Sequence, residues 1–176
     1  MSLLTRPFFE RATLQVAQEL IGKRLHFQSY SGLVTETEAY IGHEDPACHA
    51  AKGLTPRTKV MFGPAGLSYV YLIYGMYHCL NIVTETEGFP AAVLIRGVLW
   101  EQQPSRHLDG PGKLCKAWGI TRSHNNIDLC TSDHFYVTQG IHPIGILTTP
   151  RIGIKVGKDH LWRFVMSLHD IADQIK

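Results

Sequence analysis

The stretch from Val34 to Tyr40 is the feature that most limits how this chain can fold. Its sequence, Val-Thr-Glu-Thr-Glu-Ala-Tyr, alternates in the manner of a β-strand, in which every second side chain projects from the same face. A strand here places Glu36, Glu38 and Tyr40 together. Two carboxylates side by side are costly to bury without a cationic partner, so we expect this face to belong to a functional site.

A second strand offers the missing cation. Residues 91–99 are almost continuously apolar, and one charge, Arg96, interrupts them. A buried arginine needs a carboxylate partner, because an unpaired buried charge is strongly destabilising. We therefore expect Arg96 to pair with Glu38 or Glu36.

Length and composition predict one soluble domain covering residues 1–176, with 44% hydrophobic and 18% charged residues. No apolar run approaches about 18 residues, and the N-terminus lacks a basic region followed by an apolar core, so we expect no membrane association. We expect an intracellular protein, cytoplasmic in a bacterium or nuclear in a eukaryote. The net charge of +2 does not by itself indicate nucleic acid, and a DNA partner would require the positive charge to gather on one face.

The cysteine pattern is typical of reduced thiols in a reducing compartment, because the four cysteines are widely separated and form no Cys-x-x-Cys pair. Two neighbouring pairs, Cys48-His49 and His78-Cys79, raise the possibility of zinc. Neither short ligand spacings nor a His-Glu-x-x-His helix is present, so we expect no metal and no cofactor.

Local patterns predict a strand-rich α+β fold. The clearest element is a hairpin of strands 68–74 and 77–84, whose tip carries Tyr74, Gly75 and Met76. Thr13 is the expected N-cap of a helix over 13–21, and Asp109 is a possible cap of a helix that runs through Trp118. The remaining expectations are strands over 23–28, 135–138, 151–156 and 161–165, a turn over 29–32, helices over 55–62 and 167–176, and a loop over 100–108.

Several motifs occur in one order: Glu-Thr-Glu-Ala-Tyr40, His49, Thr-Pro-Arg57, Met-Phe62, Tyr-Val-Tyr71, Tyr-Gly-Met-Tyr77, Asn81, Leu-Ile-Arg96, Gly-Pro-Gly-Lys-Leu114 and Arg-Ile-Gly153. In this order the chain resembles the alkyladenine (3-methyladenine) DNA glycosylase family, from about Phe8 to Val165. Residues 100–110 are shorter than is usual in that family, and the tail after Met166 departs from it. The resemblance implies a single α+β domain with a curved, mainly antiparallel, open-barrel-like sheet, a protruding hairpin and surrounding helices.

The same resemblance implies a monofunctional DNA glycosylase of base excision repair. Such an enzyme flips an alkylated or deaminated purine out of double-stranded DNA and hydrolyses the N-glycosidic bond, leaving an abasic site. Glu38 would activate the water, Arg96 would orient Glu38, and the backbone carbonyl of Ile152 would help to hold that water. The expected lesions include 3-methyladenine, 7-methylguanine, hypoxanthine and ethenoadenine, and the expected state is a monomer.

The resemblance also assigns the contacts with the base and with DNA. Tyr40 on one side, with His49 and Tyr71 on the other, would sandwich the flipped purine, and Asn81 would discriminate against normal purines. Tyr74 would fill the vacated space in the duplex. The other expected DNA contacts are Met76, Tyr77, Arg57, Met61, Lys113 and Arg122. No lysine is marked as a nucleophile, and Lys52, Lys59 and Lys113 are the ones that could overturn a monofunctional mechanism.

Two other classes of function remain open at this point. A non-catalytic nucleic-acid-binding module would keep the tyrosines and basic residues but would not need Glu38 buried against Arg96. A zinc hydrolase would use His49, Cys48, His78 and Cys79, and a chelator would abolish its activity.

Overall fold

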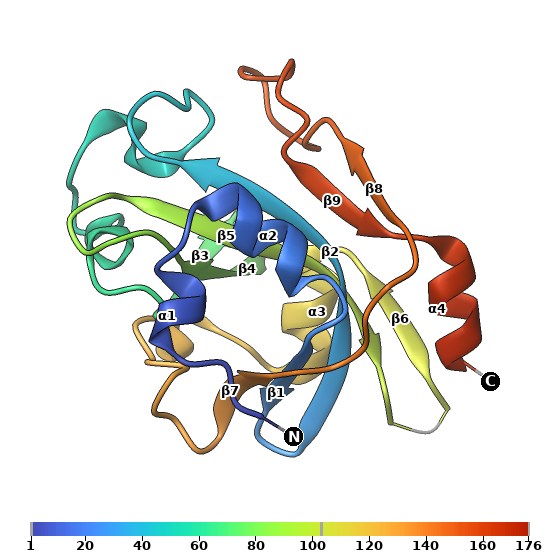
Figure 1. Ribbon diagram of the computed structural model, residues 1–176. Coiled ribbons are helices and arrows are strands. Elements are labelled where there is room, and N and C mark those ends of the chain that lie inside the picture. The colour runs from blue at the N-terminus through green and yellow to red at the C-terminus, as the bar shows by residue number, and fades with distance from the viewer. Residues whose placement is uncertain (1, 103, 176) are drawn as a thin grey trace.

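The computed structural model describes residues 2–102 and 104–175, which form one curled antiparallel sheet with helices on both sides (Figure 1). Nine strands and four α-helices are present in these residues. The central path of the sheet runs β3-β4-β5-β2-β1-β7, while β6 pairs with β5, β9 with β2, and β8 with β9. This half-barrel confirms the α+β class and the curved, mainly antiparallel sheet. The strands are β1 Arg24–Phe27, β2 Tyr30–Ile41, β3 Ser68–Ile73, β4 Tyr77–Val83, β5 Ala91–Trp100, β6 Arg106–Asp109, β7 Phe135–Thr138, β8 Ile146–Thr149 and β9 Arg163–Met166.

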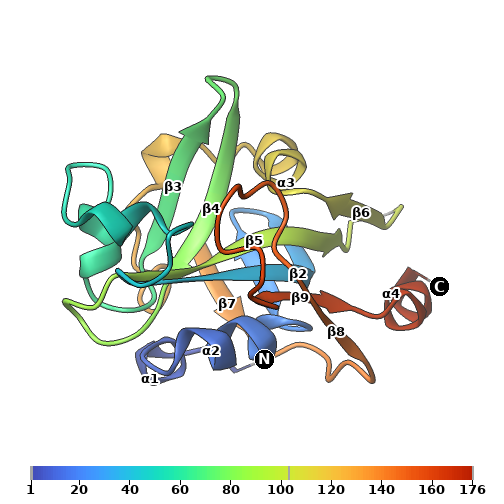
Figure 2. The same ribbon diagram turned by 90° about the horizontal axis from the view of Figure 1, so that it is seen from above.

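The helices cover the two sides of the sheet (Figure 2). α2 packs on β2 and β5, while α3 packs on β4 and β5 from the other side. The main core lies between these layers, and its largest fully buried side chains include Trp118, Phe9, Phe27 and Phe135. The helices are α1 Arg6–Phe9, α2 Thr13–Leu20, α3 Pro111–Trp118 and α4 Leu168–Ile175, with short 3-10 helices at His49–Lys52, Lys59–Phe62 and Arg122–His124. None of the described helices has the length and apolar character to cross a membrane.

Strand β2 organises the site because both of its faces are covered. On one face Thr35, Thr37 and Ala39 are fully buried, and the Thr37 hydroxyl donates to the carbonyl of Ala17 in α2 over 2.8 Å. The opposite face carries Glu36 and Glu38, as the alternation predicts. The register shifts around Glu36, where β2 changes its pairing with β5.

The β3–β4 hairpin extends beyond the rest of the sheet, as predicted (Figure 2). Tyr74 adopts a left-handed backbone conformation with φ of 53° at its tip, followed by Gly75 with φ of 70°. The Tyr74 side chain is 78% exposed and that of Met76 is 66% exposed. Large apolar side chains are rarely left so exposed at a loop tip, which favours a partner that covers them.

Several local expectations were wrong, two of them because strand pairing overrode the local pattern. β2 already begins at Tyr30, so the expected turn over 29–32 is replaced by a tight turn at Gln28 and Ser29. β6 forms within the expected loop over 100–108, because its backbone pairs with the end of β5. Residues 151–156, all of which the structure describes, form a loop in place of the expected strand. The expected helix over 55–62 is reduced to the 3-10 turn Lys59–Phe62.

Both expected helix caps were also wrong. The N-cap of α2 is Ala12, and Glu85 supplies the missing acceptor by binding the amide of Thr13 over 2.7 Å and its hydroxyl over 2.8 Å. The N-cap of α3 is Gly110. Asp109 instead accepts a hydrogen bond from Lys113 over 2.6 Å, one turn along the chain.

Candidate active site

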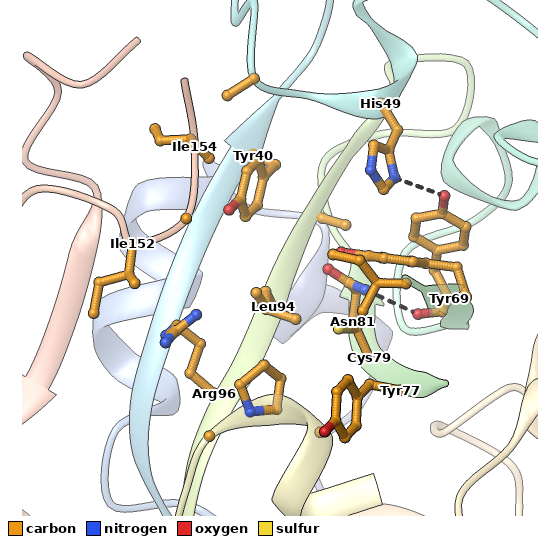
Figure 3. A pocket seen from close by; sticks show the side chains of 18 of the residues that line it. Tyr40, His49, Tyr69, Tyr77, Cys79, Asn81, Leu94, Arg96, Ile152 and Ile154 are labelled. Atoms are coloured by element: carbon orange, nitrogen blue, oxygen red, sulfur yellow. Dashed lines mark hydrogen bonds between the residues drawn. The ribbon is translucent and has the colours of Figure 1, made fainter. Parts of the chain in front are cut away.

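A cavity of about 600 Å³ opens between the hairpin, the start of α3 and the loop before β9 (Figure 3). The sheet forms its floor through β4 and β5, and the 3-10 helix that carries His49 closes one end. Figure 2 shows the loop before β9 lying over β5 beside the hairpin. The lining of the cavity includes Tyr40, His49, Tyr71, Asn81, Arg96 and Ile152. Five of these six were singled out from the sequence as catalytic or substrate-binding side chains, and the sixth, Ile152, was named for its backbone carbonyl.

Glu38 lies beneath this cavity with a fully buried side chain. Its Oε1 accepts a hydrogen bond from the backbone N–H of Ile152 over 2.7 Å, and its Oε2 accepts one from the Tyr40 hydroxyl over 2.8 Å. Ile152 contacts Glu38 through its N–H, whereas the family resemblance assigned a role to its carbonyl, that of holding the water. Because both oxygens act as acceptors, the hydrogen bonds favour the ionised carboxylate.

Arg96 joins the two carboxylates of β2, as expected. Its Nε lies 2.8 Å from Oε1 of Glu36 and 3.5 Å from Oε1 of Glu38, so the hydrogen bond goes to Glu36 and Glu38 receives the nearby charge. Arg163 of β9 also donates to Oε1 of Glu36, over 2.6 Å. Two arginines thus neutralise two carboxylates in the partly buried floor of the site.

The pKa of Glu38 is raised above its ordinary value, and burial is the largest cause. The charge of Arg96, the N–H of Ile152 and the hydroxyl of Tyr40 act in the opposite direction by stabilising the carboxylate. The negative charge of Glu36 adds to the upward shift. The carboxylate is therefore more basic than an exposed glutamate, while these three contacts act in favour of its ionised form.

An aromatic wall faces Tyr40 across the cavity, and Figure 3 shows Tyr40 and His49 on opposite sides. The His49 and Tyr71 rings are 4.6 Å apart in an edge-to-face arrangement, and Nδ1 of His49 lies 3.0 Å from the hydroxyl of Tyr69. Burial and then the positive charge of Arg57 lower the pKa of His49 to about 4. The imidazole is therefore neutral at physiological pH and offers an uncharged edge to a ligand.

Asn81 lies on the floor of the cavity with 3% of its surface exposed. Its Nδ2 donates to the carbonyl of Tyr69 over 3.1 Å, which fixes the orientation of the amide. Cys79, which was considered only as a zinc ligand, lines the same floor. The Cys79 thiol contacts the hydroxyl of Tyr71. The pKa of the thiol is raised, with burial as the largest cause, so Cys79 is a neutral group here.

The expected DNA-binding residues separate into four places. Tyr74, Tyr77 and Lys113 lie at the cavity mouth, while Met76 is exposed at the hairpin tip. Met61 is only 2% exposed and packs in the cavity wall, rather than on the outer surface expected for a DNA contact. The two remaining residues, Arg57 and Arg122, line a second hollow beside β3.

Comparison with known proteins gives the family of the chain. The model of the family described as methylpurine-DNA glycosylase (MPG) matches residues 7–170. The chain belongs to this family. The resemblance recognised from the motifs is thereby confirmed, as is the enzyme class, a DNA glycosylase that hydrolyses N-glycosyl bonds.

Curated relatives agree over nearly the whole chain. A protein of Sodalis glossinidius is 60% identical over 163 residues, covering 93% of this chain and 96% of its own. A protein of Rickettsia felis is 59% identical over 165 residues, with coverages of 94% and 93%. One of Wolbachia sp. subsp. Brugia malayi is 59% identical over 162 residues, with coverages of 92% and 96%. Each carries the name "Putative 3-methyladenine DNA glycosylase".

Three groups of this glycosylase were missed from the sequence. They are the N–H of Ile152, the second arginine on Glu36, which is Arg163, and a buried pair formed by Asp45 and Arg151. The motif Arg-Ile-Gly153 marked the segment, but a backbone N–H has no sequence signature. Among the residues that the structure describes, no group of three histidine, cysteine, aspartate or glutamate side chains is placed to hold a metal ion.

Proposed function

We propose that this glycosylase removes damaged purines from double-stranded DNA by hydrolysis, with Glu38 as the base that activates water. The observation that carries the proposal is the buried Glu38 carboxylate beneath an aromatic cavity of about 600 Å³, with its two oxygens held by Ile152 and Tyr40. A purine inside a duplex cannot reach such a site. The base must therefore be extruded, at a cost of a few kcal/mol.

The cavity provides two aromatic surfaces for the extruded base. Tyr40 forms one, and His49 with Tyr71 forms the other. The neutral ring of His49 can stack or donate a hydrogen bond without repelling a cationic methylated purine. Asn81, fixed by its bond to Tyr69, presents a rigid amide to the base and can reject exocyclic groups that clash with it.

In the chemical step, the oxygen of a water forms a bond to C1′ of the deoxyribose while the bond from C1′ to the purine nitrogen breaks. The water proton passes to Glu38, and the purine departs with the bonding electrons. A carboxylate has about four acceptor positions, and Ile152 and Tyr40 use two of them, so room remains for this proton. The negative charge of Glu38 also stabilises the oxocarbenium-like transition state.

The reaction ends at an abasic site if no lysine attacks C1′. Lys52 and Lys59 are exposed and lie outside the cavity lining, whereas Lys113 and Lys155 contribute to its mouth. The ammonium of Lys113 is held 2.6 Å from Asp109. We infer a monofunctional enzyme that acts as a monomer on duplex DNA, with Glu38 and not a lysine beside the reacting carbon.

The test is a duplex carrying one hypoxanthine or ethenoadenine, incubated with the enzyme and EDTA and then treated with hot alkali. Strand scission that appears only after alkali indicates an abasic product. Glu38→Gln should abolish it, because glutamine cannot accept the water proton. The matched control is Glu101→Gln, which neutralises a carboxylate paired with Arg24 at the opposite end of β2 and should leave excision unchanged.

Three outcomes would contradict this proposal. Full activity of Glu38→Gln would move the catalytic base elsewhere. A covalent enzyme–DNA adduct trapped by borohydride would reveal a lysine nucleophile, with Lys113 and Lys155 as the residues to replace. Tight lesion binding without excision by the unmodified protein would favour a binding module.

A further inference from the structure

A buried ion pair lies against the ring of Tyr40, whose hydroxyl donates a hydrogen bond to the proposed catalytic base Glu38. The side chains of Arg151 and Asp45 are both fully buried, and they form a two-pronged contact of 2.6 Å and 2.9 Å. A buried pair of this kind is a costly way to stabilise a fold, because both charges lose their hydration. Such a pair indicates a need for defined geometry at this place.

The Arg151 guanidinium connects segments that are distant in sequence. Its Nη1 also donates to the carbonyl of Ala39 in β2 over 2.9 Å. One face lies 4.7 Å from the ring centre of Tyr40, and the ring of Trp162 is 4.9 Å away. Arginine can serve all these partners at once because its planar head has five donors and flat faces.

Asp45 extends the same network to the segment that carries His49. Its Oδ2 accepts a hydrogen bond from the N–H of Ile41 and its Oδ1 accepts one from the N–H of Ala47. The carbonyl of Asp45 accepts the N–H of Cys48, immediately before His49. One buried pair therefore fixes Tyr40 and the approach to the opposite aromatic wall.

The residue after Arg151 supplies the N–H that binds Glu38. Ile152 is itself 48% exposed, and residues 151–157, all of which the structure describes, belong to no helix or strand. The loop is attached here by Arg151 on one side and by the bond from Ile152 to Glu38 on the other. Without the Arg151 anchor, little in the sequence of this loop would fix the direction of the Ile152 N–H.

We propose that Arg151, held by Asp45, is a positioning residue that sets the Ile152 N–H against Glu38 and supports the Tyr40 ring from behind. The proposal rests on the role of Glu38 proposed above. Arg151 does not line the cavity proposed to receive the purine. It acts through Ile152 and Tyr40, the two donors that hold the carboxylate oxygens in place.

A specific pH effect follows from this arrangement. The charged and titratable groups facing Glu38 are Arg96 from β5, Glu36 and Tyr40 from β2, and Cys79 from β4. Burial raises the pKa of Glu38, and the N–H of Ile152 is among the groups that lower it again. Loss of a well-directed N–H should therefore raise this pKa and move the acid limb of the excision rate to higher pH.

The decisive variant is Arg151→Lys, which keeps a positive charge beside Asp45 but loses the two-pronged geometry and the flat faces. We expect single-turnover excision at least about tenfold slower, since small misplacements of a catalytic group are costly. The acid limb should move to higher pH, and the affinity for lesion DNA should change less than about threefold. The matched control is Arg24→Lys, which alters the two-pronged pair with Glu101 away from the cavity.

A merely structural role would give a different result. The burst amplitude of Arg151→Lys would then be smaller, because fewer molecules are active. The excision rate constant and the acid limb would equal those of the unmodified enzyme, and this result would overturn the proposal. Hydrogen exchange of the unmodified protein gives a test that needs no variant. The Ile152 amide should exchange as slowly as the paired amides of β2, and fast exchange would overturn the proposed attachment.

The same set of measurements separates this proposal from the one on which it rests. Glu38→Gln is measured in parallel, and if it excises normally, the base assignment fails whatever Arg151 does. If Glu38→Gln is inactive while Arg151→Lys retains the normal rate and pH profile, only the positioning role of Arg151 fails.

Discussion

Replacing Tyr74 with asparagine should make the protein more stable and a poorer glycosylase at the same time. Tyr74 has φ of 53°, a left-handed conformation that costs a non-glycine residue about 1–2 kcal/mol. Asparagine adopts this conformation more readily. Because the Tyr74 side chain is 78% exposed, its removal sacrifices little burial.

The balance of these terms is a gain of about 1 kcal/mol in the free energy of unfolding. For a chain of this length such a gain raises the Tm by roughly 2–4 °C. Excision should move in the opposite direction, because the tyrosine ring that we expect to fill the space left by the extruded purine is lost. Extrusion costs a few kcal/mol, and losing even 1.4 kcal/mol of compensation slows the reaction about tenfold.

Urea unfolding and single-turnover excision measure the two effects separately. The matched control is Gln28→Asn, since Gln28 also has φ of 53° but lies in the exposed turn between β1 and β2. That control should gain similar stability and excise normally. A loss of stability in Tyr74→Asn would refute the strain argument. Normal excision by Tyr74→Asn from a fully paired duplex would refute the proposed role of the Tyr74 ring.

Three further predictions concern the charges around the site. Glu36→Gln should lower the free energy of unfolding by about 3 kcal/mol in urea titrations, because it weakens two charge-assisted hydrogen bonds. Its pH–rate profile should show the acid limb at lower pH, because burial and then this neighbouring negative charge raise the pKa of Glu38; an upward move would contradict the network. The pKa of His49 is lowered to about 4 from 6.5, so neutral His49 contributes stability that is present above pH 6.5 and lost as the pH falls toward 4. His49→Gln should therefore flatten the pH dependence of unfolding between pH 4 and 6.5, and an unchanged slope would show that His49 titrates normally. Arg57→Gln and Arg122→Gln should each reduce the slope of log binding constant against log salt concentration by about 0.9 if each contacts one phosphate, whereas an unaltered slope would place that arginine off the DNA.

The sequence was informative wherever a local pattern had a single physical solution. The alternation from Val34 to Tyr40 placed Glu36, Glu38 and Tyr40 on one face of β2, and the hairpin boundaries differ by one residue or less at each strand end. The single arginine of β5, Arg96, was expected to pair with a carboxylate, and it lies beside Glu36 and Glu38. The ordered motifs gave the family, which the comparison confirms.

Only the tertiary structure decided how these charges are shared. Glu36 accepts hydrogen bonds both from Arg96 of β5 and from Arg163 of β9, and Arg163 is 127 residues away along the chain. Asp45 and Arg151 are 106 residues apart in the sequence, and no local pattern predicts that both side chains will be fully buried.

The sequence by itself therefore determined the chemical groups of this glycosylase, because strand periodicity and charge pairing act over a few residues. The tertiary structure determined their geometry. A backbone N–H such as that of Ile152 is the same group in every residue except proline. It acquires a role at Glu38 only when the sheet, the 151–157 loop and the buried Arg151 bring it to that place.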